Sequence, residues 1–134
     1  MSDASSKIYV PQDTTARSLG ADDVAQAIVS EGQKRGVEVE LVRNGSRGLY
    51  WLEPLVEVEV DGVRQAYGPV TTDAVAGLFD AGFHAGAEHA LALGATEELP
   101  ELKRQSRLTF ARVGITDPLS LDDYRAHGGL QGLE

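Results

Sequence analysis

The chain has 134 residues and a mass of 14.3 kDa, which is enough for one ordinary domain and too short for two. Twelve Lys and Arg against 21 Asp and Glu give a net charge of −9 at pH 7, which disfavours binding to nucleic-acid phosphates or to an anionic membrane surface. The absence of cysteine excludes disulfides, thiol catalysis and any iron–sulfur cluster held by thiolates of this chain.

No stretch of the sequence is typical of membrane insertion or export. A transmembrane helix needs about 18 continuous apolar residues, and no window approaches that length. The first six residues lack the basic and then apolar pattern of a signal peptide. We therefore expect a cytoplasmic protein without a membrane or nucleic-acid partner.

The first predicted unit is a strand, a helix and a second strand. Residues 7–10 favour a short strand that Pro11 ends. A helix follows, because Asp22 or Asp23 can cap a stripe at helical spacing that Gly36 is placed to end. The stripe consists of Val24, Ala27 and Ile28. Alternation over residues 37–41 then indicates a half-buried strand, so the order predicts a right-handed parallel βαβ unit.

A hairpin comes next. Asp61 and Gly62 separate two alternating runs, and this pair is the strongest short signal for a hairpin because both turn residues must tolerate positive φ. The alternation places the acidic residues of the strands on the solvent face of the sheet. These are Glu38, Glu40, Glu57 and Glu59.

A second helix completes the predicted domain. Thr71 or Thr72 can cap it, and its apolar stripe follows the 3.6-residue period. The stripe consists of Val75, Leu78, Phe79 and Phe83. The order β-α-β-β-β-α predicts an α/β, thioredoxin-like fold in residues 1–96, with a mixed four-stranded sheet and flanking helices.

Residues 97–134 read as a linker into a further domain. They combine a short helical stretch (98–105), an extended stretch (108–113) and a helix opening that Ser120 can cap. We expect residues from about Val113 onward to lie outside the core of the first domain.

Few residues suggest chemistry of their own. His84 and His89 do not share a helical face, and neither they nor His127 form a metal-ligand pattern. Arg43 and Arg47 flank a Gly-containing loop that could hold an anion, but the loop lacks the spacing of a phosphate-binding motif. The run at residues 49–52 is aromatic and either closes the core or forms an exposed interaction anchor.

Residues 7–83 resemble the thioredoxin-like [2Fe–2S] domain of the small NADH-dehydrogenase subunit of respiratory complex I and related hydrogenases. That family has C-x-x-x-x-C after one strand and C-x-x-x-C after a later strand, with a Pro four residues beyond. Superposing these motifs on the sequence puts non-cysteine residues at all four ligand positions: Pro11, Ala16, Ser46 and Tyr50. The resemblance therefore implies a scaffold that has lost its cluster.

The tail carries a more specific resemblance. Residues 107–114 and the pattern D-P-x-S-x-x-x-Y-x-x-x-G-G over residues 117–129 are similar to the segment that precedes the FMN domain in the flavin- and NADH-binding subunit of these enzymes. The whole arrangement is similar to the N-terminal domain of the beta (diaphorase) subunit of cytosolic, molybdenum-containing, NAD-dependent formate dehydrogenases. Residues 44–54 and 102–105 also fit that subunit closely.

The resemblance implies a non-catalytic docking domain with no cofactor and no metal. The parent subunit is implied to bind FMN, NAD and a [4Fe–4S] cluster elsewhere, and the implied partners are its FMN/NADH domain and other subunits of the complex. Five apolar side chains are candidates for docking: Tyr50, Trp51, Leu119, Leu121 and Tyr124. Two alternatives remain, namely the same domain in a NAD-linked hydrogenase or other complex I-like dehydrogenase, and a free-standing module that binds a small anion through Arg43 and Arg47.

We predict that the purified protein is colourless and binds neither iron nor flavin, because the chain has no cysteine and no flavin-binding Gly-rich loop. Iron analysis and an absorbance scan after anaerobic reconstitution check this. A stoichiometric cluster would contradict the lost-cluster interpretation.

Overall fold

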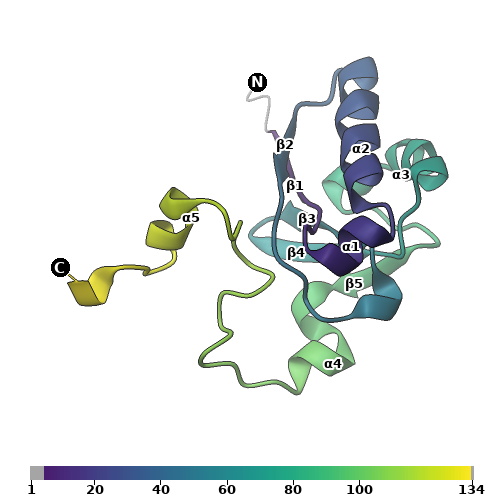
Figure 1. Ribbon diagram of the computed structural model, residues 1–134. Helices are drawn as coiled ribbons and strands as arrows, with labels where there is room; N and C mark the ends of the chain where they lie inside the picture. Colours follow the sequence, from purple (N-terminus) through teal and green to yellow (C-terminus); the bar gives the residue numbers. More distant parts are fainter. Residues whose placement is uncertain (1–4, 134) are drawn as a thin grey trace.

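Alternating apolar residues build a five-stranded mixed sheet at the centre of the fold (Figure 1). The computed structural model describes residues 5–133. The strand order is β2-β1-β3-β4-β5. The strands are β1 (Ser6–Tyr9), β2 (Val39–Val42), β3 (Val56–Val60), β4 (Val63–Tyr67) and β5 (Ala92–Ala95).

The pairing confirms the predicted βαβ unit and hairpin. Strand β1 runs parallel to β2 and antiparallel to β3, with Ile8 opposite both Leu41 and Val58. Strands β3 and β4 join through Asp61 (φ 50°) and Gly62 (φ 77°), so both turn residues take the left-handed conformation that a tight hairpin requires.

The sequence predicted four strands, but the sheet contains a fifth. Strand β5 pairs antiparallel with β4, with Ala95 opposite Gln65. Its sequence, Ala-Leu-Gly-Ala, contains no β-branched or aromatic residue and therefore gives little strand signal. Pairing with the edge of β4, a tertiary contact, makes this segment a strand.

The first helical region differs from the prediction at its start. A short helix α1 (Thr14–Ser18) precedes α2 (Ala21–Arg35), and Gly20 with φ 99° occupies the N-cap position that was assigned to Asp22 or Asp23. Both aspartates lie in the first turn, where their charge favours the positive end of the helix dipole. Gly36 ends α2 in the left-handed conformation, as predicted.

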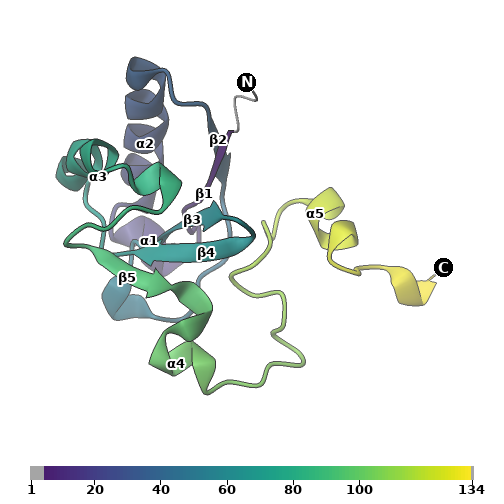
Figure 2. The same cartoon turned by 180° about the vertical axis from the view of Figure 1, so that it is seen from behind.

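Helices α2 and α3 (Val75–Ala81) lie side by side on one face of the sheet (Figures 1 and 2). Thr71 precedes a 3-10 turn (Thr72–Ala74) that leads into α3. Three members of the predicted stripe lie in α3 and are buried against the sheet, and Leu78 is 0% exposed. The fourth, Phe83, is also buried but lies in a 3-10 turn (Phe83–Ala85), because Gly82 ends the helix earlier than predicted. The core formed there consists of 15 buried residues: Ile8, Val10, Ala16, Ala21, Val24, Ala25, Ile28, Val56, Val58, Tyr67, Val70, Val75, Leu78, Phe79 and Phe83.

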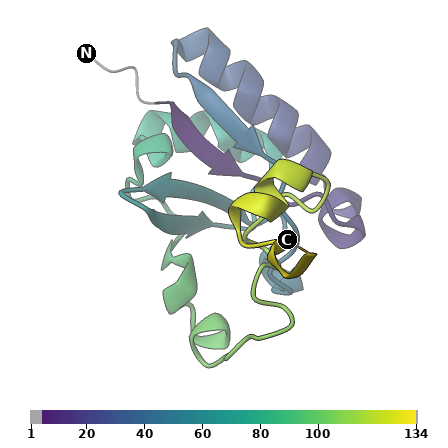
Figure 3. The same ribbon diagram turned by 90° about the vertical axis from the view of Figure 1, so that its left-hand side faces the viewer.

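The C-terminal third leaves this core and returns to the opposite face of the sheet. After a 3-10 turn (Thr96–Glu98) and helix α4 (Pro100–Lys103), the expected extended stretch 108–113 is a series of turns. Helix α5 (Leu121–Ala126) lies on the side away from α2 and α3, and it stands in front of the sheet in Figure 3. The Ser120 hydroxyl accepts a hydrogen bond from the Asp123 amide at 3.1 Å, so the predicted cap of α5 is present.

We predict that Leu78→Ala or Phe79→Ala lowers the free energy of unfolding by about 2–5 kcal/mol, because each side chain is buried against the sheet and its truncation leaves a cavity. Urea denaturation measures the change. Glu38→Ala, at an exposed position of the same domain, is the matched control and should shift stability by less than about 0.5 kcal/mol. Similar midpoints for all three variants would contradict the packing described.

Candidate functional site

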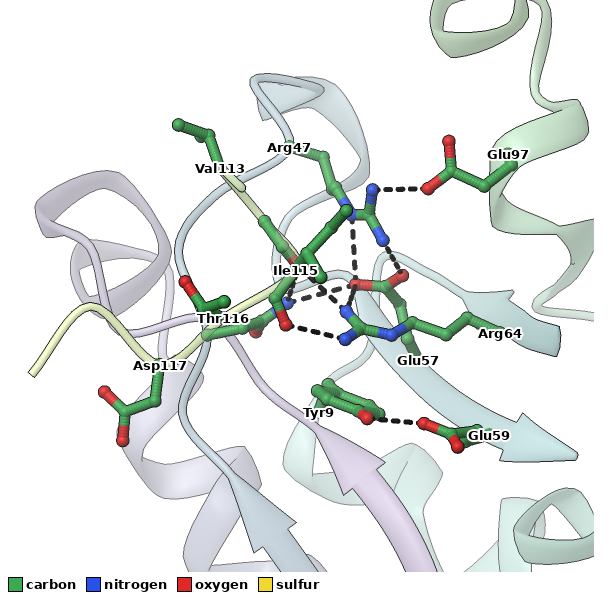
Figure 4. Close-up of polar contacts among 12 residues, drawn as sticks. Tyr9, Arg47, Glu57, Glu59, Arg64, Glu97, Val113, Ile115, Thr116 and Asp117 are labelled. Atoms are coloured by element: carbon green, nitrogen blue, oxygen red, sulfur yellow. Dashed lines mark hydrogen bonds and ion pairs between the residues drawn. The ribbon is translucent and has the colours of Figure 1, made fainter. Parts of the chain in front are cut away.

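The face of the sheet opposite the helices carries a buried charge cluster centred on Glu57 (Figure 4). The Glu57 side chain is 1% exposed, although the alternation in β3 predicted a solvent-facing position. Arg47 Nη2 lies 2.8 Å from Glu57 Oε1, and Asn44 Nδ2 donates to Glu57 Oε2 at 3.1 Å. Arg64 Nη1 adds a longer ion pair at 3.8 Å, and Glu97 pairs with Arg47 at 2.7 Å. The solvent-face prediction was therefore wrong for Glu57.

The prediction failed because a distant segment covers this face. Residues 114–117, called the strap below, cross the sheet on the side away from α2 and α3 (Figures 1 and 4). Glu40 on the edge strand β2 lies on the same face, and both it and Glu38 are exposed as predicted. Glu59 is half-buried and accepts a hydrogen bond from the Tyr9 hydroxyl at 2.5 Å.

Hydrogen bonds from charged and buried donors hold the strap. The Gly114 carbonyl accepts from Asn44 Nδ2 at 2.8 Å and from Arg64 Nη1 at 2.9 Å, while the Ile115 carbonyl accepts from Arg64 Nη2 at 2.6 Å. Gln12 Nε2 donates to Asp117 Oδ1 at 3.0 Å. Hydrogen bonds to charged groups contribute about 1.5–3 kcal/mol each, so the strap is firmly attached to the sheet.

Gly114 fits a position that no larger residue can take. Its φ is +81°, and a Cβ there would overlap the side chain of Arg47. Gly114 and Thr116 are buried, whereas the neighbouring Val113 is 42% exposed. The strap is therefore attached to the sheet but contributes no residue to the hydrophobic core described above, and both the expectation for residues from Val113 onward and the boundary between residues 96 and 97 remain predictions.

Tyr9 orients the arginine that holds the strap. The Arg64 guanidinium lies 3.5 Å from the centre of the Tyr9 ring, which is a close cation–π arrangement. Burial and the hydrogen bond to Glu59 raise the pKa of Tyr9 above its usual range. The stacked ring and the neighbouring Glu57 together fix the direction in which Arg64 donates to the strap.

The four positions assigned to lost cysteines lie on two loops and their adjoining short helices. Pro11 follows β1 and Ala16 lies in α1, and both are buried. Ser46 lies in the loop after β2, and Tyr50 begins a 3-10 turn (Tyr50–Leu52) with 56% exposure. Backbone and side-chain hydrogen bonds join the loops: Gln12 N donates to the Asn44 carbonyl at 3.0 Å, and the Arg43 guanidinium donates through Nη2 to the Pro11 carbonyl at 3.1 Å. Their correspondence with cluster ligands stays a prediction.

A buried carboxyl group lies beside one of these positions. Ser46 donates to Glu53 Oε1 at 2.7 Å, while Glu53 Oε2 has no hydrogen-bond partner among the described residues. Burial raises the pKa of Glu53, and the negative charge of Asp13 adds to this effect. Two buried carboxyl oxygens without a hydrogen-bond partner among the described residues, Asp13 Oδ1 and Glu53 Oε2, therefore lie near the positions that the resemblance assigns to cluster ligands.

The candidate docking side chains are exposed, as such a role requires. Tyr50 and Trp51 are 56% and 61% exposed, whereas Leu49 beside them closes the core at 3% exposure. The remaining three flank or belong to α5 and are also exposed: Leu119, Leu121 and Tyr124. Their role in docking remains a proposal.

The two arginines of the anion-binding alternative are used internally. Arg43 pairs with Asp22 at 2.6 Å, and Arg47 pairs with Glu57 and Glu97. This arrangement holds loops and the strap together and gives no support to an anion site there.

The three histidines lie apart. His84 stacks on Phe79 with ring centroids 5.5 Å apart, His89 accepts from the Leu91 amide, and His127 lies 3.1 Å from Asp123. Within residues 5–133 no group of three or more His, Cys, Asp or Glu side chains is placed to hold a metal ion. None of the described helices combines the length and apolar character needed to cross a bilayer.

Sequence reasoning missed Asn44, Arg64, Glu97 and Gly114 as parts of the cluster. One signal was available: the Asp61-Gly62 turn fixes the hairpin register and sets Arg64 directly opposite Glu59 on the face that Glu57 shares. No local pattern indicated that residues 114–117 would return to cover this face.

Comparison with solved structures supports the fold. The chain is similar to the thioredoxin-like [2Fe-2S] ferredoxin from Aquifex aeolicus in three structures. One wild-type structure gives a TM-score of 0.54 at 17% identity, covering 67% of this chain and 97% of that chain. A second structure gives 0.55 at 18%, covering 69% and 93%, and a cysteine-to-serine variant gives 0.54 at 19%, covering 66% and 98%. No family model and no curated protein matches the sequence.

These similarities confirm the predicted α/β, thioredoxin-like fold, with five strands rather than four. The chain has the fold of a thioredoxin-like ferredoxin and contains no cysteine, so it has no thiolate with which to bind a [2Fe–2S] cluster.

We predict that Glu57→Ala lowers the free energy of unfolding by about 3–5 kcal/mol, because it leaves two guanidinium groups without their buried counter-charge. Thermal or urea denaturation measures this. Glu40→Ala on the same face is the control, since its 3.9 Å pair with Lys7 is exposed and contributes less than about 1 kcal/mol. Equal losses would mean that the strap does not bury Glu57.

A second prediction concerns the pH dependence of stability. Because the pKa of Glu53 is raised on folding, the folded protein binds this proton more tightly than the unfolded chain. The resulting stability is present below the unfolded pKa, about 4.3, and is lost as pH rises through the folded pKa. Glu53→Gln should therefore gain stability relative to the wild type as pH rises, in urea melts over this range.

The exposed Glu101→Gln provides the comparison for this series. Its stability profile should run parallel to that of the wild type. A Glu53→Gln profile that is also parallel would show that Glu53 titrates normally in the folded protein.

Proposed function

We propose that this chain is the non-catalytic N-terminal domain of the diaphorase subunit of a cytoplasmic NAD-dependent formate dehydrogenase. The parent enzyme would pass electrons from formate to NAD+, and this domain would hold the subunit's FMN/NADH domain and neighbouring subunits in place. It would take no part in hydride or electron transfer itself.

The observation that carries the docking role is the attachment of the strap. Charged side chains fix residues 114–117 to the sheet, and α5 follows directly with exposed apolar residues. A rigid attachment sets the direction in which the chain continues. Leu119 and Leu121, at 83% and 54% exposed, are then presented to whatever packs against this end of the domain.

Two further observations support the assignment to this type of enzyme. The fold is that of a thioredoxin-like ferredoxin, and the ligand cysteines are absent. The D-P-x-S-x-x-x-Y-x-x-x-G-G pattern, which in the complex I-like enzymes precedes the FMN domain, falls on residues 117–129. Formate as the parent substrate rests on the sequence resemblance alone, and a NAD-linked hydrogenase is the alternative parent.

A binding experiment with recombinant FMN/NADH domains tests the proposal. Calorimetric titration should detect binding of this chain to the FMN/NADH domain of a formate dehydrogenase diaphorase subunit. The variant Leu119→Ser/Leu121→Ser should weaken it about tenfold or more, because it removes two apolar contacts. Lys34→Ser, exposed on α2, should leave it unchanged.

The outcomes separate the candidates. Binding only to the corresponding domain of a hydrogenase would favour that parent. Binding to neither domain would overturn the docking role.

A further inference from the structure

One exposed segment carries positive charge, whereas the rest of the chain is acidic. Residues 103–112, called the basic loop below, contain four basic residues and no acidic one, whereas the rest of the chain has 21 acidic residues against eight basic. The loop begins at the last residue of α4 and extends away from the sheet before the chain returns as the strap (Figure 1). Its basic residues are Lys103, Arg104, Arg107 and Arg112.

Most of this positive charge is not neutralised within the described residues. Lys103 pairs with Glu98, but the three arginines form no ion pair with a carboxylate of residues 5–133. Arg107 donates to the Val113 carbonyl at 3.3 Å, and Arg112 donates to the His127 carbonyl at 2.8 Å. Neutral acceptors leave the guanidinium charges available to an external counter-charge.

Large apolar side chains lie between these charges and face solvent. Leu108 is 93% exposed and Phe110 is 65% exposed. These two side chains add little to the stability of the fold, because they stay largely in contact with water. Apolar and aromatic side chains flanked by arginine are typical of residues that contribute most to protein–protein binding.

We propose that the basic loop is a docking element for an acidic amphipathic segment of a partner protein, with an apolar stripe flanked by carboxylates. Phe110 and Leu108 would pack on the stripe, and Arg104 and Arg107 would pair with carboxylates along its edges. This surface adjoins α5 through the hydrogen bond from Arg112 to the His127 carbonyl, but its four binding residues are not those of the proposed function, and its argument does not depend on the identity of the parent enzyme.

Charge distribution favours a protein over a nucleic acid or a membrane. An acidic patch on a protein is local and can meet the loop alone, which projects from the body of the molecule (Figure 1). A polynucleotide or an anionic bilayer extends its negative charge over a wide area, and the acidic remainder of this chain would then be repelled. The exposed Leu and Phe also favour a partner that offers an apolar surface.

Fluorescence anisotropy with defined probes tests the proposal on the intact chain. The first probe is a labelled peptide of about 16 residues that combines Glu and Asp with Leu and Phe at helical spacing. The second has the same charge with Ser in place of the apolar residues. A single-stranded oligonucleotide and vesicles containing phosphatidylserine represent the other anionic partners. We expect the first peptide to bind most tightly and to bind more weakly as salt shortens the Debye length from about 30 Å to about 8 Å.

Two variants locate the binding. Arg104→Ser/Arg107→Ser and Leu108→Ser/Phe110→Ser should each weaken binding of the first peptide about tenfold or more. Their urea midpoints should change little, because Arg104, Leu108 and Phe110 are exposed and the half-buried Arg107 makes hydrogen bonds only within residues 105–113. Lys34→Ser/Arg125→Ser removes the same charge elsewhere on the surface and is the matched control.

The proposal is overturned if the first peptide does not bind, if the loop variants bind like the control, or if the oligonucleotide or vesicles bind at least as tightly. Since neither loop variant changes a residue of α5, failure of this test leaves the test of the proposed function unaffected.

Discussion

The buried carboxylate of Glu57 is the constraint on which the placement of the C-terminal part of the chain depends. It lies on the face of the sheet that the strap covers. A buried carboxylate is tolerated only when donors surround it, and Arg47, Arg64 and Asn44 supply them. Arg64 and Asn44 in turn donate hydrogen bonds to carbonyls of the strap, which is distant in sequence. The loop after β2, the hairpin and the strap therefore stabilise one another.

The opposite face of the sheet is stabilised by apolar burial rather than by charge pairing. Its 15 buried core residues are held by apolar burial between the sheet and helices α2 and α3. Ala16, one of the four positions assigned to lost ligands, belongs to this core. A scaffold whose stability lies in such a core can retain a thioredoxin-like ferredoxin fold without the thiolates that a cluster needs.

Local sequence patterns predicted most of the helices and strands, whereas the environment of the candidate site depends on tertiary contacts. Strands rich in Val, the Asp61-Gly62 turn and the stripe ending in Phe83 carry their signals within a few residues, and all three were predicted. Strand β5 has almost no intrinsic strand preference, and the environment of Glu57 depends on residues more than fifty positions away. The alternation of β3 shows which side chains share a face, but it cannot show whether a later segment covers that face.

The same cluster that holds the strap also determines how the basic loop is presented. Leu102, 6% exposed, fixes the chain before the loop, and the buried Gly114 fixes it afterwards. A segment tethered at both ends samples fewer conformations than a free tail, so less entropy is lost when it is ordered by a partner. The donors on Gly114 are Asn44 and Arg64, which are placed by Glu57. A buried carboxylate on one strand thus reduces the entropic cost of docking through exposed side chains that it does not touch.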